Sequence, residues 1–436
     1  MDTKFRARKW SPSIALGVLG LLAPVRAVGQ GGAQGAPQNP PARVTLDYSI
    51  DLALKHNHSL QASRTLILQN RAQEITANLR PNPVGLVDEQ YMPFFSPQAF
   101  TSNYIDQSAV YDLGLSYLIE RGKKRQHRLE AAKDQTAVTT AQVGDDERTL
   151  AFNVASQFIS AVLAQADLDL AEKDLASFQQ TVDISQASFT AGAISGGDLL
   201  KIKIQLLQFQ MDVSAAKLAR VQALASLRQL LGYESVPESY EVVGDLEYKP
   251  VKLGEDDLKA MALRQRPDVR AAQLGVTAAQ SQFTLAKANG KKDLGVTFTY
   301  NHLGGVNTGS LFFNIQLPIF DRNQGEIART QYAITQSQEL SSEQASIALT
   351  DVTNSYEALR TDDEVVQLYQ SGYLKEAEDS RDISQYAYQH GSASLLDYLD
   401  AERSYRATEL AYRQALATYM TSLEQLRQAV GTRSLP

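Results

Sequence analysis

An internal duplication restricts the fold of this chain more than any other feature of its sequence. Four segments recur in the same order: 53–62 at 262–271, 118–125 at 318–325, 188–200 at 387–399, and 227–232 at 426–431. The last two pairs share an offset of 199 residues, as in SFTAGAISGGDLL and AYQHGSASLLDYL. We therefore expect two copies of one structural unit, at 44–232 and 253–431. An equatorial linker at 233–252 joins them, and 432–436 forms a tail.

The first 27 residues are predicted to be a secretory signal peptide. Lys4, Arg6, Arg8 and Lys9 precede an apolar run from Ile14 to Leu22, and the small residues Ala23 and Ala27 flank a cleavage point. Residues 28–43, rich in Gly, Gln and Pro, are expected to form a flexible linker. No later apolar run is expected to cross a membrane as a helix, so any crossing should use strands.

Each repeat is predicted to contain a helix, two strands, a very long helix, a sharp turn and a last helix. In the first repeat we expect the helices at about 47–79, 123–189 and 198–231. Heptad spacing supports the long helix, in Leu168, Leu175, Val182 and Phe189, with Ala171, Phe178 and Ser185 beside them. The returning helix carries Ile204, Met211, Leu218 and Ala225 at the same spacing, which predicts that the two helices pack antiparallel.

The expected helix lengths indicate an extended assembly rather than a globule. The first and last helices, 33 and 34 residues, together equal the 67 residues of the middle one. At roughly 1.5 Å per residue the middle helix is on the order of 100 Å long, about three times the thickness of a bilayer core. A mainly α fold with a small β part is therefore predicted, and a soluble coiled-coil rod fits these lengths equally well.

The predicted strands favour a membrane barrel over a rod. Apolar and polar residues alternate in three of them, at Tyr111–Ile119, Leu294–Tyr300 and Leu311–Leu317, and a fourth at Val84–Phe95 is weakened by Asp88, Glu89 and Pro93. Such alternation is typical of strands with lipid on one face and water on the other. Four strands cannot close a barrel, whereas three chains would supply twelve. The alternative is a soluble four-stranded sheet packed on the helices.

Composition excludes several classes of function. The formal net charge of −7 gives no basic field for nucleic acid. The absence of cysteine excludes disulfides, thiolate metal sites and a lipidated cysteine. No catalytic triad, phosphate loop or zinc signature occurs, so we expect no enzyme, cofactor or metal site. His56 and His58 are two residues apart and face different sides of a helix.

A turn motif occurs once in each repeat, as aromatic, x, x, Gly, x, x, Ser, x, x, Asp. Its positions are Phe189, Gly192, Ser195 and Asp198, then Tyr388, Gly391, Ser394 and Asp397. Gly can end a helix in the left-handed conformation, Ser can cap the next helix, and Asp can complete a capping box. A helical hairpin turn explains the Gly and Ser fully.

With these motifs in order over 44–431, the sequence resembles the TolC-type outer membrane factors. The resemblance implies a homotrimer, with a twelve-stranded barrel in outer-membrane lipid continued by a periplasmic tunnel of helices. It also implies that the hairpin tips form the closed periplasmic end, where a periplasmic adaptor protein docks. The implied docking residues are Gly192, Ala193, Ile194, Ser195, Gly391, Ser392, Ala393 and Ser394.

The second tip is also predicted to hold the channel gate. Asp397 and Asp400 are spaced i, i+3 and share one helix face, so a threefold assembly would place six carboxylates around the axis. The resemblance implies an aspartate pair at these positions in the tunnel constriction. The alternative is that Asp397 only caps its helix and Asp400 is solvated. The first tip differs, because it carries Asp198 followed by Lys201.

The resemblance further implies a clasp of an aromatic, an aspartate and a basic residue. Tyr388 and Asp198 match the first two positions, but Ala393 occupies the basic one, so the clasp is expected to be incomplete. The junctions LIERGKKRQHR and LPIFDRNQG resemble most the branch that serves heavy-metal efflux.

The expected function is a passive outer-membrane exit duct. An adaptor would dock it to a proton-driven or ATP-driven inner-membrane pump. The alternatives are the duct of a protein secretion system and a periplasmic coiled-coil scaffold without a pore.

Overall fold

The computed structural model describes residues 42–251 and 254–435. The predicted signal peptide and almost all of the predicted linker at 28–43 lie outside the described residues.

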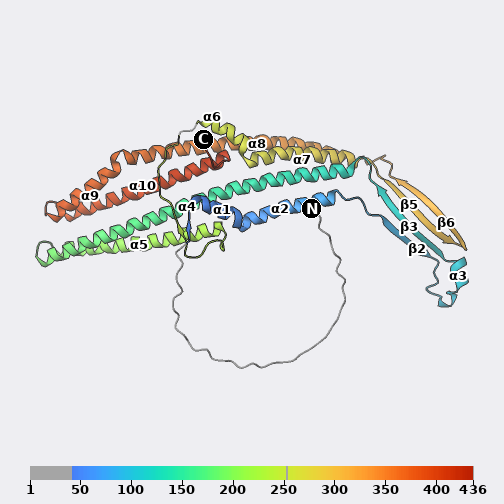
Figure 1. Cartoon of the computed structure of the whole chain (residues 1–436), viewed down its shortest axis with the longest axis horizontal. Coiled ribbons are helices and arrows are strands. Elements are labelled where there is room, and N and C mark those ends of the chain that lie inside the picture. The colour runs from blue at the N-terminus through green and yellow to red at the C-terminus, as the bar shows by residue number, and fades with distance from the viewer. Residues whose placement is uncertain (1–41, 252–253, 436) are drawn as a thin grey trace, which may run out of the picture. The chain divides into compact units, whose positions relative to one another are not determined.

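Helices make up most of the described chain, which confirms the prediction of a mainly α fold with a small β part. The helices are α1 (Leu46–His56), α2 (His58–Ala77), α3 (Ser102–Gln107), α4 (Lys124–Thr190), α5 (Gly196–Leu231), α6 (Glu255–Gln265), α7 (Pro267–Asn289), α8 (Gln324–Leu368), α9 (Leu374–Gln389) and α10 (Leu395–Val430). The strands are β1 (Arg43–Val44), β2 (Val84–Gln90), β3 (Val110–Ile119), β4 (Glu241–Val242), β5 (Leu294–Leu303) and β6 (Val306–Ile315). In Figure 1 the four-stranded sheet lies at one end of the helices, and the hairpin tips lie at the other.

The helix predicted at 47–79 is interrupted at Asn57, which takes an extended ψ of 120° and separates α1 from α2. The Asn57 side chain accepts a hydrogen bond from the Leu60 N–H and donates one, at 2.9 Å, to the Leu230 carbonyl at the end of α5. The second repeat has the same break at Arg266, where Pro267 begins α7. Proline is favoured in a first turn and disfavours helix before it, so Pro267 was the signal for this break.

The prediction of one long helix in the first repeat is confirmed, because α4 runs without a break for 67 residues. Helix α5 packs against it, as predicted, but the α5 residues named for the seam are wrong. Ile204, Met211 and Leu218 are exposed, whereas Ile202, Phe209 and Val213 are buried. The spacing of seven was correct, but α5 carries two apolar stripes and periodicity alone does not say which one faces α4.

By length and composition alone, one described helix, α4, is long and apolar enough to cross a membrane. From the sequence, no later apolar run of that length was expected. Between Arg148 and Asp167, α4 has no charged residue. In the structure this stretch packs against other helices, and Leu150, Val154 and Phe158 belong to a core cluster with residues of α1 and α5. Burial among helices therefore accounts for its apolar character.

The long helix of the second repeat is not continuous, contrary to the prediction. A π-helical segment, Tyr369–Tyr373, separates α8 from α9, and Gly372 within it has φ 139° and ψ −22°. Residues other than glycine rarely adopt such a positive φ. Nothing in the periodicity indicated this break, because apolar spacing reports faces and not single backbone angles.

The four predicted strands form one antiparallel sheet in the order β2-β3-β5-β6. Strand β2 is shorter than predicted and ends at Gln90, because Tyr91 takes a positive φ of 58° and turns the chain away. Strand register places apolar residues together on one face, which we call the apolar face. It contains Val87, Leu113, Leu115, Val296, Phe298, Tyr300, Leu311 and Phe313. The opposite, polar face contains Asp112, Ser116, Thr297, Thr299, Asn301, Ser310 and Asn314.

Candidate gate at the hairpin tips

The first tip joins α4 to α5 through a glycine-terminated turn. Gly192 has φ 77°, and the next N–H, of Ala193, donates to the Ser188 carbonyl at 2.8 Å. These are the contacts of a helix that ends in the left-handed conformation. Ser195 then caps α5 by accepting a hydrogen bond of 3.1 Å from the Asp198 N–H. The predicted structural roles of Gly192 and Ser195 are therefore confirmed.

The second tip repeats this geometry between α9 and α10. Gly391 has φ 73°, and Ser392 N–H donates to the Ala387 carbonyl at 2.8 Å. Ser394 and Asp397 form a complete capping box: Asp397 N–H donates to Ser394 Oγ, and Ser394 N–H donates to the Asp397 carboxylate, each at 3.2 Å. Asp397 thus caps its helix, as the structural alternative predicted.

The carboxylate at the first tip is locally neutralised. Asp198 accepts a hydrogen bond of 2.8 Å from Ser195 Oγ, and Lys201 Nζ lies 3.4 Å from its other oxygen. The Ser195 hydroxyl, together with Lys201, lowers the pKa of Asp198 below its ordinary value. The first tip therefore presents little net charge.

The carboxylates at the second tip face away from the rest of the chain. Asp397 and Asp400 are exposed, whereas Tyr398 and Leu399 between them and Leu395 before them are buried. Arg403, one turn further along α10, lies 3.7 Å from Asp400 and forms a solvent-exposed ion pair with it. The sequence interpretation overlooked Arg403, although its i, i+3 spacing from Asp400 was a signal.

Within the single chain, Tyr388 contacts Tyr398 of its own hairpin rather than Asp198. Its ring stacks on Tyr398 at 5.6 Å between centroids, and among the described residues no hydrogen bond joins it to Asp198. Tyr398 is 2% exposed and its hydroxyl lies 3.4 Å from Thr181 Oγ1. Both tyrosines contact an apolar cluster that joins the two hairpins, the tip cluster, made by Phe178, Val182, Ile202, Phe209, Leu395, Tyr398 and Leu399.

An ionic clamp joins the hairpins about two turns further from the tips. Arg406 of α10 donates to Asp174 of α4 at 3.0 Å and to Asp212 of α5 at 2.7 Å. Its guanidinium also lies 4.3 Å from the centre of the Phe209 ring. Arg413, two turns on, donates to the Ala166 carbonyl at 2.6 Å. Sequence reasoning missed this clamp, because its partners are 232 and 194 residues apart in the chain.

Two carboxyl groups at the clamp, Asp174 within it and Glu402 beside it, are partly buried. Burial raises the pKa of Glu402, and the nearby negative charge of Asp174 adds to the rise. Burial also raises the pKa of Asp174, against the opposing effect of Arg406. Protonation is therefore easier at this level of the helices than at an exposed carboxylate.

No group of three or more His, Asp or Glu residues that could hold a metal ion occurs within 42–251 and 254–435. His56 ends α1 and His58 begins α2, and both are exposed.

A family model described as "Outer membrane efflux protein" matches residues 49–233 and 258–432. The chain is 27% identical over 302 residues to the cation efflux system protein CusC of Escherichia coli K12. The match covers 65% of this chain and 63% of CusC, so it spans slightly less than two thirds of that relative. It is 23% identical over 401 residues to the cobalt-zinc-cadmium resistance protein CzcC of Cupriavidus metallidurans, covering 91% of this chain and 90% of CzcC.

A crystal structure of CusC shares this fold. It superposes with a TM-score of 0.72 at 21% identity, over 89% of this chain and 92% of that chain.

Proposed function

The chain belongs to the outer membrane efflux protein family, and we propose that three copies of it form the exit duct of a tripartite efflux system. The protein resides in the bacterial outer membrane, as its relatives do. The observation that carries the proposal is the sheet, whose apolar face and two open edges leave it incomplete in a single chain.

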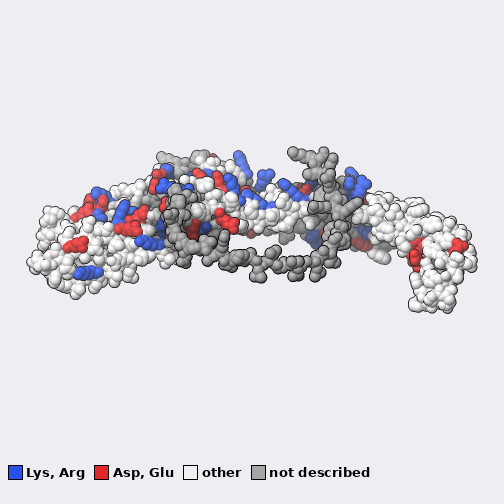
Figure 2. Space-filling view, turned by 60° about the horizontal axis from the view of Figure 1, so that its bottom comes forward, with Lys and Arg blue, Asp and Glu red and all other residues white. Residues whose placement is uncertain are grey.

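The apolar face is suited to contact lipid. Leu113, Phe298 and Phe313 on that face are each more than half exposed, whereas hydroxyl and amide side chains occupy the polar face. The strand segments contain no Lys or Arg between Arg80 and Arg121, or between Lys292 and Arg322. Figure 2 shows Lys and Arg over the helices and none over the sheet end of the face in view. This charge distribution fits strands in lipid with a basic boundary on the periplasmic side.

The two edges of the sheet favour closure by a trimer. Strands β2 and β6 are each paired on one side only, and an open edge cannot be satisfied in lipid. Pairing β6 of one chain with β2 of the next, three times, closes a barrel of twelve strands. Strand β2 runs away from the helices and β6 runs toward them, so this pairing is antiparallel as well.

A second unpartnered surface supports the same assembly. Helix α5 exposes an apolar stripe at heptad-like spacing, made by Leu200, Ile204, Leu207, Met211, Leu218 and Val221. We propose that this stripe, named the α5 stripe, packs against a helix of the neighbouring protomer. A continuous apolar stripe on a helix normally marks such a contact.

We propose that the gate is formed by Asp397 and Asp400 of three chains. Their exposed face of α10 is free to line the axis. Arg403 lies 3.7 Å from Asp400, so three copies would set six carboxylates against three guanidinium groups, and the net negative charge would favour cations. Tyr388 acts indirectly, by stacking on Tyr398 and so fixing the start of α10. Asp198 contributes little field, because Lys201 and Ser195 engage it.

The turns at the tips are proposed to dock a periplasmic adaptor. Gly192, Ala193 and Ser195 at the first tip, with Ile194 half-buried beside them, present mainly backbone and small side chains, as do Gly391, Ser392, Ala393 and Ser394 at the second. Surfaces of this kind allow close approach of another helical hairpin. The inner-membrane pump would supply the energy, and the duct itself is passive.

Electrical recording of the purified protein tests this proposal. Detergent-extracted trimers should insert into a planar lipid bilayer and give discrete, cation-selective conductance steps. A protein that fractionates without membranes and gives no conductance would instead be a coiled-coil scaffold, and the proposal would be wrong.

A further inference from the structure

The loop between β2 and β3, residues 91–109, carries four exposed aromatic side chains. Tyr91, Phe94, Phe95 and Phe100 are 69%, 68%, 101% and 46% exposed. Phe94 and Phe100 are in edge contact, with ring centroids 6.2 Å apart. No charged residue occurs between Glu89 and Asp106. An exposed aromatic group of this kind, without charge around it, indicates a surface that something apolar covers.

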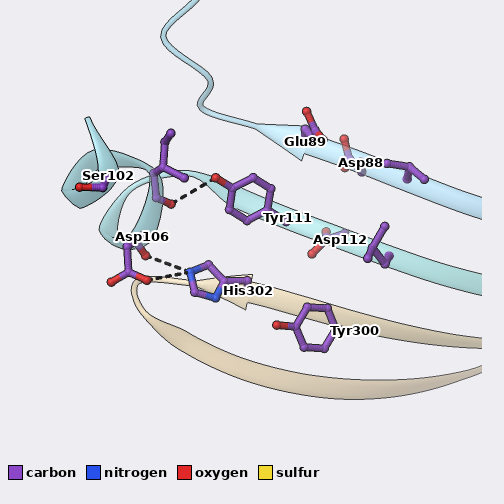
Figure 3. Close-up of a pocket in the computed structure, with 11 residues that line it drawn as sticks. Asp88, Glu89, Ser102, Asp106, Tyr111, Asp112, Tyr300 and His302 are labelled. Carbon is purple, nitrogen blue, oxygen red and sulfur yellow. Dashed lines mark hydrogen bonds and ion pairs between the residues drawn. The ribbon is translucent and has the colours of Figure 1, made fainter. Parts of the chain in front are cut away.

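The loop is held against the sheet by hydrogen bonds at the turn between β5 and β6. The Gly305 N–H donates to the Asp106 carbonyl at 2.9 Å, and the same carbonyl oxygen lies 3.0 Å from His302 Nε2. The Tyr111 hydroxyl donates to the Ile105 carbonyl at 3.5 Å. Figure 3 shows these side chains meeting between α3 and the ends of the strands. The position of the loop is therefore fixed by contacts to β3 and β5.

These contacts place the loop over the apolar face rather than the polar face. Tyr111 and His302 are register partners. Each lies two residues from an apolar-face residue of its own strand, Leu113 and Tyr300, so both side chains lie on the apolar face. Between α3 and this face lies a cavity of about 610 Å³, lined among others by Ile105, Tyr111, Leu113, Tyr300 and His302. The loop thus continues the apolar face at the strand ends remote from the helices.

We propose that the loop at 91–109 is a lipid anchor, in which Phe94 and Phe95 enter the outer leaflet at the boundary between headgroups and acyl chains. The inference rests on the proposed function, because it requires lipid against the apolar face. A loop on the lipid side of a barrel rim must meet the membrane surface. Aromatic side chains are favoured at that depth, and the absence of charge from the segment between Glu89 and Asp106 removes the main cost of entering it.

Tryptophan fluorescence tests this directly, because the single tryptophan of the sequence, Trp10, lies in the predicted signal peptide and is removed with it. In the exported protein, F95W therefore reports on the loop alone and F313W on the apolar face of β6 alone. Y332W, at an exposed position of α8, is the control remote from lipid. Each full-length variant is reconstituted in phosphatidylcholine vesicles, and quenching is compared between unmodified lipid and lipid brominated on its acyl chains.

The proposal expects F95W and F313W to emit at shorter wavelength than Y332W and to lose emission to brominated lipid, with Y332W unaffected. Quenching of F313W without quenching of F95W would overturn the lipid anchor and leave the duct standing. If F95W is shielded from acrylamide but not quenched by brominated lipid, a neighbouring protein surface covers the loop and the anchor is again wrong. Quenching of neither variant would contradict the duct together with the anchor.

Discussion

Asp397 has two roles that a single substitution would confuse. Its carboxylate completes the capping box with Ser394, and it is also proposed to contribute charge to the gate. Loss of such a cap costs about 1 kcal/mol of helix stability, which could loosen the tip without any change in axial charge. The two roles are separable because Ser394 takes part in the first and carries no charge.

Replacing Asp397 and Asp400 together by asparagine should reduce cation selectivity, because the six proposed axial carboxylates are removed. Reversal potentials across a salt gradient in planar bilayers measure this. The S394A variant loses the cap but keeps the charge, so it should retain selectivity. The D198N/K201Q variant should also retain it, because it removes both members of the Asp198–Lys201 pair and leaves the net charge of the first tip unchanged. Unchanged selectivity in the D397N/D400N protein would remove these residues from the gate.

Glu402 should make the folded protein less stable as pH rises. Its pKa is raised in the folded state by burial and by Asp174, so the folded chain binds this proton more readily than the unfolded chain. That contribution is present at low pH and is lost as pH rises from the ordinary carboxyl range through the raised value. E402Q mimics the protonated form without this titration. It should raise the melting temperature by about 1–2 °C at neutral pH and have little effect in acid.

The melting temperatures of E402Q and the parent protein are measured by thermal unfolding from pH 4 to pH 8, in steps of about half a pH unit. E376Q, which changes an exposed carboxylate of α9, is the matched control and should follow the parent curve. An E402Q curve parallel to the parent over the whole range would contradict the raised pKa.

The break between α8 and α9 is a property of a whole element, although one residue makes it possible. Gly372 has φ 139°, which costs an L-residue on the order of 1–3 kcal/mol. The corresponding stretch of the first repeat, in α4, is continuous. The two hairpins therefore differ in backbone as well as in charge, and the second one has a local irregularity between its tip and its base.

G372A should lower the thermal stability of the protein, because alanine is strained at that backbone conformation. G325A is the matched control, since Gly325 lies in α8, has no left-handed φ, and has open space where the added Cβ would lie. It should be neutral or slightly stabilising. Equal melting temperatures for the two variants would mean that the π-helical segment is not retained in solution.

The helices, turns and strands that could be predicted are those whose residues follow a periodic or repeated sequence pattern. Helix α4, both hairpin turns and the sheet strands follow from heptads, from the Gly and Ser of the turn motif, and from alternation. The break at Asn57 depends on a buried side chain that bonds Leu230, and the clamp at Arg406 depends on tertiary packing. Contacts of that kind have no local signature, so the sequence located the tips but not the links between them.

At the scale of the whole molecule, the α5 stripe is proposed to be covered only in the trimer. M211E introduces a charge into the centre of that stripe and should shift the detergent-solubilised protein from trimer to monomer. Q210E changes an adjacent exposed residue outside the stripe and should remain trimeric. Light scattering coupled to size-exclusion chromatography gives the mass of each. A trimeric M211E protein would place the protomer contact elsewhere.

Closure of the barrel by three chains is the central claim, and the absence of native cysteine allows it to be measured by cross-linking. Leu86 on β2 and Phe312 on β6 share the polar face at opposite edges of the sheet. A chain carrying L86C and F312C, treated in membranes with a short thiol-reactive linker, should give covalent dimers and trimers in a denaturing gel. The series should stop at the trimer, and each single-cysteine variant should give neither product. A ladder that continues past the trimer would indicate an open polymer, and no cross-linked product would contradict the closed barrel.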